Sequence, residues 1–171
     1  MHNSSYENMR RFVSKYLQGI TLSSVLDVGS QDVNGTYKSL FAGWDYKGLD
    51  IYPGKNVDIV IANAYHWEAV ASNSYDVVIS GQAFEHIEFF WLIMNEIARV
   101  LKAGGFCCII APSSGPTHSV PDCWRFMPDG LRAMANWVKL EVLEAYIGWD
   151  SIRNAEDDQW RDAVLICQKT C

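Results

Sequence analysis

The segment Ser23-Ser24-Val25-Leu26-Asp27-Val28-Gly29-Ser30-Gln31-Asp32-Val33-Asn34-Gly35-Thr36 decides the fold of this chain. Its apolar run, residues 25–28, is typical of a strand that is covered on both faces of a sheet. Gly29 permits a sharp turn that brings a ligand close to the main chain. The polar residues that follow offer caps for a helix, which we expect over residues 35–42. Small polar ligands bind at such turns, because free N–H groups collect at the carboxyl edge of a parallel sheet.

Three kinds of nucleotide site compete for this turn. A P-loop needs four residues between its glycines and then Lys, whereas five separate Gly29 from Gly35 and Thr36 follows directly. A dinucleotide fingerprint needs a second glycine where Gln31 stands, which disfavours a nicotinamide-dependent oxidoreductase. The third kind needs one tight glycine and an acid at the end of the next strand. Asp50 is that acid, and its carboxylate can accept both ribose hydroxyls of an adenosine ligand. The turn therefore favours a nucleoside without phosphates.

Four segments follow one another along the chain: Val25-Leu26-Asp27-Val28-Gly29-Ser30, Gly48-Leu49-Asp50-Ile51, the stretch from Ser74 to His86, and the stretch from Ala98 to Phe106. Together they resemble the successive motifs of class I S-adenosylmethionine-dependent methyltransferases. The resemblance implies a Rossmann-like, doubly wound α/β fold with a mostly parallel seven-stranded sheet and an antiparallel edge hairpin. It also implies S-adenosyl-L-methionine as the cofactor. The glycine turn and the later Trp124-Arg125-Phe126 segment resemble members associated with polysaccharide and secondary-metabolite pathways.

The resemblance also implies which residues contact the cofactor. They are Asp27, Gly29, Ser30, Asp50, Ile51, Asn63, Ala64, Gly81 and Gln82. Asn63 stands where the family usually carries an acid that accepts the adenine amino group, and an amide oxygen accepts that hydrogen bond more weakly. Ile51 would pack on the adenine face, although a plain core position explains it equally well.

Two histidines are candidates for the catalytic base. Methyl transfer to a hydroxyl needs a group that removes a proton, and histidine is suited because its unperturbed pKa is about 6.5. His86 follows the fourth expected strand, beside the expected methyl position, and His118 lies in a long loop. The structural alternatives are a histidine that hydrogen-bonds a loop and a surface histidine. Glu85 is not expected to bind a metal, because the sequence groups no set of acids or histidines around it.

The loop over residues 112–128 is expected on the substrate side. It is rich in Pro, Gly and Ser and has no periodicity, which is typical of functional loops. Trp124 could form a wall of the acceptor pocket or anchor the loop. Arg125 could bind an acceptor carboxylate or phosphate, or it could pair with Asp122 or Asp129.

Composition indicates one domain over residues 1–171, because 49% of the residues are hydrophobic and the length is that of a single domain. A formal net charge of -6 argues against broad binding of nucleic acid or anionic membranes. We find no apolar signal region and no membrane-length apolar run. Five cysteines without paired C-x-x-C spacing favour reduced thiols in a cytoplasmic protein and no zinc site. The sequence leaves a homodimer open.

Hydrophobic periodicity predicts the remaining elements. An amphipathic helix within residues 1–20 would pack on the sheet or, alternatively, close over the ligand as a lid. Gly104-Gly105 would end the long helix expected at residues 89–102, and Asp157-Asp158 would form a turn. Strands are expected at residues 25–28, 46–51, 57–61, 76–80, 106–110, 140–146 and 163–167, and helices at 35–42, 89–102, 128–137 and in a short stretch from Tyr65.

The sequence thus predicts an S-adenosylmethionine-dependent methyltransferase whose acceptor is a small molecule or a glycan. The alternative is a catalytically silent domain that binds S-adenosylmethionine or another nucleoside for regulation or assembly. The short chain motivates that alternative, because no sizeable insertion builds a dedicated acceptor domain.

Overall fold

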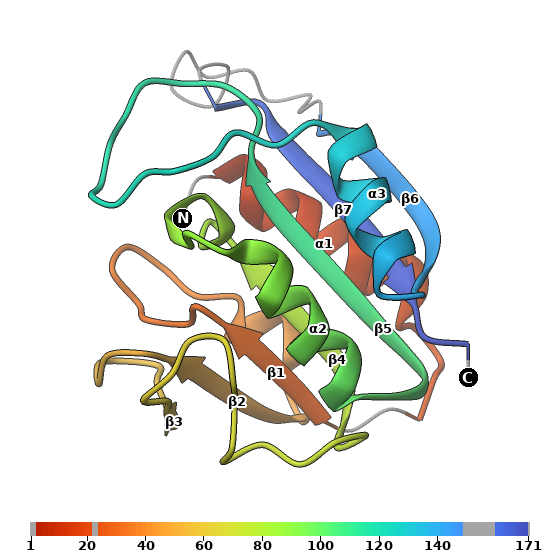
Figure 1. Ribbon diagram of the computed structural model, residues 1–171. Helices are drawn as coiled ribbons and strands as arrows, with labels where there is room; N and C mark the ends of the chain where they lie inside the picture. Colours follow the sequence, from red (N-terminus) through yellow and green to blue (C-terminus); the bar gives the residue numbers. More distant parts are fainter. Residues whose placement is uncertain (1–2, 22–23, 149–159, 171) are drawn as a thin grey trace.

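A single seven-stranded sheet forms the centre of the molecule (Figure 1). The computed structural model describes residues 3–21, 24–148 and 160–170. The sheet has the order β3-β2-β1-β4-β5-β7-β6, in which β1 to β5 are parallel and β7 is antiparallel to both of its neighbours. The strands are β1 (Ser24–Val28), β2 (Asp45–Asp50), β3 (Ile59–Val60), β4 (Tyr75–Gly81), β5 (Leu101–Pro112), β6 (Glu141–Ile147) and β7 (Asp162–Gln168). The predicted Rossmann-like architecture is confirmed.

Helices cover both faces of this sheet. In Figure 1, α2 (Phe90–Val100) and α3 (Pro128–Trp137) lie in front of it, and α1 (Asn3–Tyr16) lies behind β5 and β7. Two short 3₁₀ helices, η1 (Lys38–Phe41) and η2 (Phe84–His86), follow β1 and β4. Among the described residues, no helix combines the length and apolar character that crossing a membrane requires.

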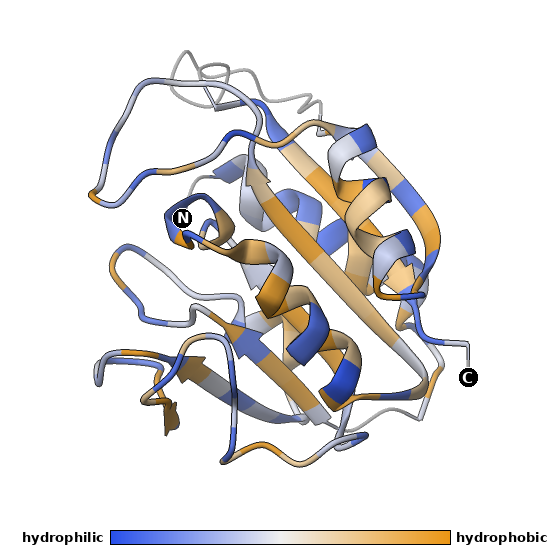
Figure 2. Ribbon diagram, in the orientation of Figure 1, coloured by the Kyte–Doolittle hydropathy of each residue, from blue (hydrophilic) through white to orange (hydrophobic). Residues whose placement is uncertain are grey.

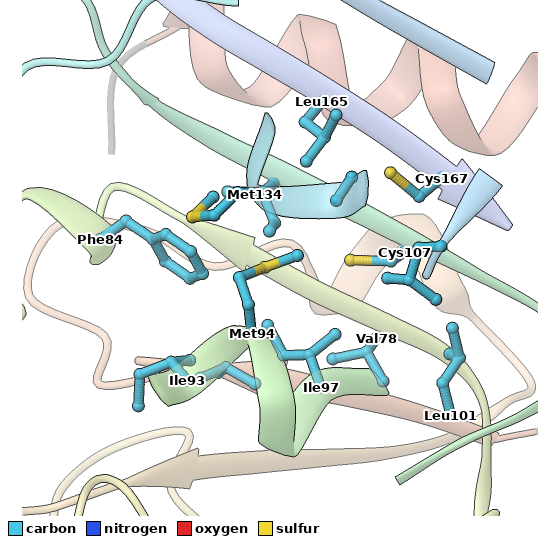
Figure 3. Packing of buried hydrophobic residues seen from close by; sticks show 14 of the residues in the cluster. Val78, Phe84, Ile93, Met94, Ile97, Leu101, Cys107, Met134, Leu165 and Cys167 are labelled. Carbon is cyan, nitrogen blue, oxygen red and sulfur yellow. The ribbon is translucent and has the colours of Figure 1, made fainter. Parts of the chain in front are cut away.

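The period-two alternation of the central strands divides the core between the two faces. Val78 belongs to the cluster that α2 and α3 cover, whereas its neighbours Val77 and Ile79 belong to the cluster that α1 covers. Figure 3 shows the first cluster, in which Val78 lies against Ile97 of α2. Apolar residues occupy most of β5 in Figure 2, as expected for a strand buried on both faces.

Helix α1 packs on the sheet through Met9 and Phe12, which are both fully buried. Its outward side chains form ion pairs within the helix or with the edge strand β6. Arg10 pairs with Glu7, and Lys15 donates to the carboxylate of Glu144 at 2.6 Å.

Three predicted local features are wrong. The helix expected at residues 35–42 is only η1, a single 3₁₀ turn. No helix begins at Tyr65, because the chain there is held in turns in which the Trp67 N–H donates to the Glu96 carboxylate at 2.7 Å. Helix α2 ends at Val100 rather than at the glycine pair, because buried Leu101 already pairs with β4. The turn expected at residues 157–158 lies outside the described residues.

The two outer strands of the sheet differ from the central ones. β3 is only two residues long. β6 shows a register shift between Val142 and Glu144, and the Glu144 carboxylate is bonded to Lys15 and Tyr16 of α1. Neither outer strand is therefore a long, regular and apolar edge.

Candidate active site

A polar pocket opens at the carboxyl ends of β1 and β4. It is lined by Asp27, Gly29, Ser30, Gln31, Val33, Asn34, Gly35, Thr36, Tyr37, Gly81 and Gln82. Five of the residues expected to bind the cofactor are brought together here, namely Asp27, Gly29, Ser30, Gly81 and Gln82. No lysine or arginine belongs to this described lining, so the pocket has no cationic side chain for a phosphate.

Gly29 makes the turn that shapes the pocket. Its φ of +75° lies in the left-handed region, and its N–H donates to the Leu49 carbonyl at 2.9 Å. A Cβ at this position would lie 2.4 Å from the Cβ of Ala83. Both the conformation and the lack of space therefore require glycine at this position.

Asp50 lies at the end of β2, next to the pocket. One carboxylate oxygen accepts the N–H of Gln31 at 3.1 Å, and the other accepts the N–H of Tyr52 at 3.2 Å. A carboxylate has about four acceptor positions, so each oxygen keeps a lone pair for a further donor. The two backbone bonds orient the carboxylate, which fits the pair of ribose hydroxyls of a nucleoside. Ile51, which follows, is 44% exposed, so an apolar ligand face can still cover it.

Asn63 and Ala64 lie outside the pocket lining. The side-chain oxygen of Asn63 accepts the Tyr65 N–H at 2.9 Å, and the Ala64 carbonyl accepts the indole N–H of Trp67 at 2.8 Å. Both residues thus shape the turn that follows β3, which packs against the cluster under α2, and neither belongs to the described lining of the pocket.

Asp27 is a buried carboxylic acid in the pocket floor. It is 3% exposed and accepts a hydrogen bond from the Tyr46 hydroxyl. Burial raises the pKa of Asp27 to about 7, an increase that the Tyr46 bond opposes. Burial and the neighbouring Asp27 also raise the pKa of Tyr46. The pocket therefore contains an acid that burial keeps protonated to higher pH than an exposed aspartate.

Helix α1 contributes to the site through two serines that sequence reasoning missed. Ser5 shares a 2.6 Å hydrogen bond with the Tyr37 hydroxyl, and Ser4 donates to buried Asp162 at 2.7 Å. Asp162 also accepts the side-chain N–H of Gln82 at 2.9 Å. Gln82 has a φ of +58°, which is uncommon for a residue with a side chain, and this network holds it there. A serine pair in a first helical turn gives no sequence signal for such contacts.

The two candidate catalytic histidines are adjacent. Their ring centroids lie 4.8 Å apart, although 32 residues separate them in the chain. The Nδ1 of His86 lies 2.6 Å from the Pro121 carbonyl oxygen, so Nδ1 is the donor of that bond. The Nδ1 of His118 lies 3.1 Å from a carboxylate oxygen of Asp122. In a neutral ring with this hydrogen bond, the lone pair is on Nε2.

Glu85 lies beside these rings, contrary to the expectation that no histidines accompany it. Its side chain is fully buried, and neither carboxylate oxygen has a hydrogen-bond partner among the described residues. Burial raises the pKa of Glu85 to about 8. The Glu85 carbonyl accepts the Cys123 N–H at 2.7 Å, so η2 is tied to the long loop.

Arg125 and Trp124 hold that loop in place. Arg125 donates to both oxygens of Asp122, at 2.5 and 2.8 Å, and to the Pro116 carbonyl at 2.7 Å. The indole N–H of Trp124 donates to the Ile87 carbonyl at 3.1 Å. The pairing of Arg125 with Asp122, one of the alternatives drawn from the sequence, is present in the structure.

Comparisons with known proteins agree with this geometry. Residues 26–109 match the family described as a methyltransferase domain. The fold is similar to that of 1,6-didemethyltoxoflavin-N1-methyltransferase from Burkholderia thailandensis, a structure with bound 1,6-didemethyltoxoflavin and S-adenosylhomocysteine. The TM-score is 0.74 at 13% identity, over 98% of this chain and 79% of that one. A SAM dependent methyltransferase from Archaeoglobus fulgidus has a TM-score of 0.62 at 16% identity, over 96% and 95% of the two chains.

The same fold also occurs in a protein named for another reaction. The [4+2]-cyclase SpnF has a TM-score of 0.70 at 12% identity, with 96% of this chain and 81% of that chain covered. At such identities these likenesses show a shared fold, and activity has to be argued from the site. A search of curated protein sequences finds no match.

Proposed function

Because the chain belongs to the class I S-adenosylmethionine-dependent methyltransferases, whose domain it matches over residues 26–109, we propose that it transfers a methyl group to a hydroxyl of a small molecule or glycan. The cofactor of this family is S-adenosyl-L-methionine. The observation that carries the proposal is the pairing of the Gly29 turn with Asp50, whose carboxylate is bound to the N–H of Gln31 in that turn.

The donor set of the pocket fits a nucleoside that carries a sulfonium instead of phosphates. Asp50 would bind the ribose hydroxyls, and Ile51 would contact the adenine. The described lining holds an acid, Asp27, and no cationic side chain, which suits a positively charged ligand and disfavours a dinucleotide. Asn63 would bind the adenine amino group through its side-chain oxygen, which also accepts the Tyr65 N–H.

The chemistry needs mainly orientation and removal of one proton. Bound S-adenosylmethionine supplies a methyl group that is already activated on a cationic sulfur. The residues of this chain would hold the acceptor oxygen in line with it at about 3–3.5 Å. Gln82, fixed by Asp162, lies where the methyl-bearing end is expected. The Nε2 of His86 or His118 would take the proton of the acceptor hydroxyl, because both Nδ1 atoms already make hydrogen bonds.

The acceptor would lie between η2 and the loop that contains His118. Trp124 and Arg125 would act there by fixing the loop. The Trp124 indole donates to the backbone of residues 87–88, and Arg125 donates to the Pro116 carbonyl within the loop. The free thiols among the described cysteines suit a cytoplasmic location.

Calorimetry of the purified chain tests the cofactor half of this proposal. S-adenosylhomocysteine should bind with one site per chain, and NAD should not bind at the same concentrations. The catalytic half is tested by following S-adenosylhomocysteine release over a panel of hydroxylated small molecules and oligosaccharides. Binding without release across the panel would favour the catalytically silent domain, and absence of S-adenosylhomocysteine binding would refute the proposal.

A further inference from the structure

A buried carboxyl group that lacks a hydrogen-bond partner among the described residues lies beside the two histidines. Both oxygens of Glu85 are inaccessible and unbonded among the residues described. Leaving such a group unsatisfied is costly, and buried carboxylates in folded proteins are paired or coordinate a metal. The surroundings of Glu85 should therefore contain a place for a cation.

Two imidazoles supply the rest of that place. One candidate ligand atom each from Glu85, His86 and His118 all lie within 4.8 Å of one another. The Nε2 of His86 is 3.7 Å from a Glu85 oxygen. Ligand atoms around a tetrahedral ion with bonds of about 2.1 Å are about 3.4 Å apart, so the widest separation in this cluster would shorten by up to about 1.4 Å when an ion binds.

The outer hydrogen bonds orient both rings for coordination. Metal-bound histidines donate their other ring N–H to a carbonyl or a carboxylate, which fixes the tautomer and raises the basicity of the ligand nitrogen. His86 makes such a bond to the Pro121 carbonyl and His118 to Asp122. Asp122 is 1% exposed and is itself held by both terminal nitrogens of Arg125. The two oriented imidazoles therefore lie beside one buried carboxyl group, and the Nε2 of His86 is its near neighbour.

From this geometry we propose that Glu85, His86 and His118 form a binding site for a divalent transition-metal ion of the zinc class. Two imidazoles disfavour magnesium and calcium, which prefer all-oxygen ligands. Three protein ligands leave at least one position open for an oxygen of the acceptor. This inference rests on the proposed function in one respect, the hydroxyl acceptor: with the ion bound, the metal would lower the pKa of that hydroxyl and its proton would pass to solvent water, whereas without the ion a histidine Nε2 would take it.

Metal titration of the full chain tests the site without any activity assay. The protein is stripped with a chelator and titrated with Zn²⁺ by calorimetry and with Co²⁺ by visible absorption. All samples carry Cys123→Ser, because this exposed thiol in the same loop is a competing ligand. We expect one ion per chain. Glu85→Gln and His118→Ala should each weaken binding at least about tenfold.

His66→Ala is the matched control, because its side chain is 62% exposed and lies outside the cluster. It should bind metal as the parent does. Absence of uptake by the parent, or equal uptake by Glu85→Gln and the parent, would overturn the site. Glu85→Gln preserves size and decides the matter even if His118→Ala does not fold. S-adenosylhomocysteine binding, measured in the same samples, separates the metal site from the proposed function. If the parent takes up the metal but does not bind S-adenosylhomocysteine, only the proposed function is refuted.

Discussion

The phenol of Tyr37 lies directly over Gly81, so that a Cβ on Gly81 would be 2.1 Å from the Tyr37 hydroxyl oxygen. Tyr37 is buried and shares a hydrogen bond with Ser5 of α1. The end of β4, the wall of the pocket and the first turn of the N-terminal helix are therefore packed as one unit. A change in any of the three should therefore alter the shape of the pocket beside Gly81.

Gly81→Ala should destabilise the protein by about 1–3 kcal/mol, because the new methyl group would overlap the buried phenol of Tyr37. Affinity for S-adenosylhomocysteine should also fall. Thermal unfolding and calorimetry measure the two effects. The control is Gly130→Ala in α3, where a Cβ meets no atom within 4 Å and should raise stability by up to about 1 kcal/mol. Equal behaviour of the two variants would contradict the packing described here.

Asp50→Ala should weaken S-adenosylhomocysteine binding about a hundredfold, since hydrogen bonds to a charged group contribute about 1.5–3 kcal/mol each. Calorimetry at constant salt measures the change. Asp45→Ala is a suitable comparison, because this exposed acid lies at the opposite end of the same strand. An unchanged affinity in Asp50→Ala would remove the ribose assignment.

Asp27→Asn should alter the pH dependence of stability. The folded pKa of about 7 lies above the ordinary value of 3.8, so the unfolded chain ionises first as pH rises. Stability of the parent is therefore lost between about pH 4 and 7, by at most about 1.4 kcal/mol per unit. The amide oxygen of the variant still accepts the Tyr46 hydroxyl. The stability of the variant relative to the parent should therefore increase from about pH 4 to 7 and stay constant above pH 7. Denaturant midpoints at pH 4, 5.5, 7 and 8 measure this, and parallel profiles would contradict it.

Arg125→Lys distinguishes a loop anchor from an acceptor ligand. A lysine cannot hold Asp122 with two parallel bonds and reach the Pro116 carbonyl as well. Hydrogen exchange in residues 113–127 should become faster, whereas S-adenosylhomocysteine affinity should stay within about twofold, since Arg125 is not in the cofactor pocket lining. If exchange is unchanged and only the KM for an acidic acceptor rises, Arg125 is a substrate ligand.

The sequence predicts the elements that rest on local pattern. The apolar runs at residues 76–80 and 163–167 lie within β4 and β7, and the helix predicted at residues 128–137 has the observed bounds of α3. It fails where tertiary contacts decide. Leu101 pairs with Tyr75 and begins a strand, so the helix-ending glycines at 104 and 105 fall inside β5.

Only part of the site could be predicted in the same way. The Gly29 turn carries its own signal in residue type and spacing. The juxtaposition of His118 with Glu85 and His86 carries none, because it depends on the path of a loop fixed by Arg125 and by the Phe126 N–H bond to the Pro112 carbonyl at 2.9 Å. Ser4 and Ser5 were missed for the same reason.

The short outer strand β3 and the irregular outer strand β6 have a consequence for self-association. A second copy could extend the sheet only at β3 or at β6. β3 is two residues long, and β6 has a register shift next to Glu144, whose carboxylate is bound to Lys15 of α1. Short or irregular edge strands of this kind disfavour strand pairing between two molecules. A homodimer of this protein would thus have to form through its helices or loops, and filament growth along the sheet is discouraged from both directions.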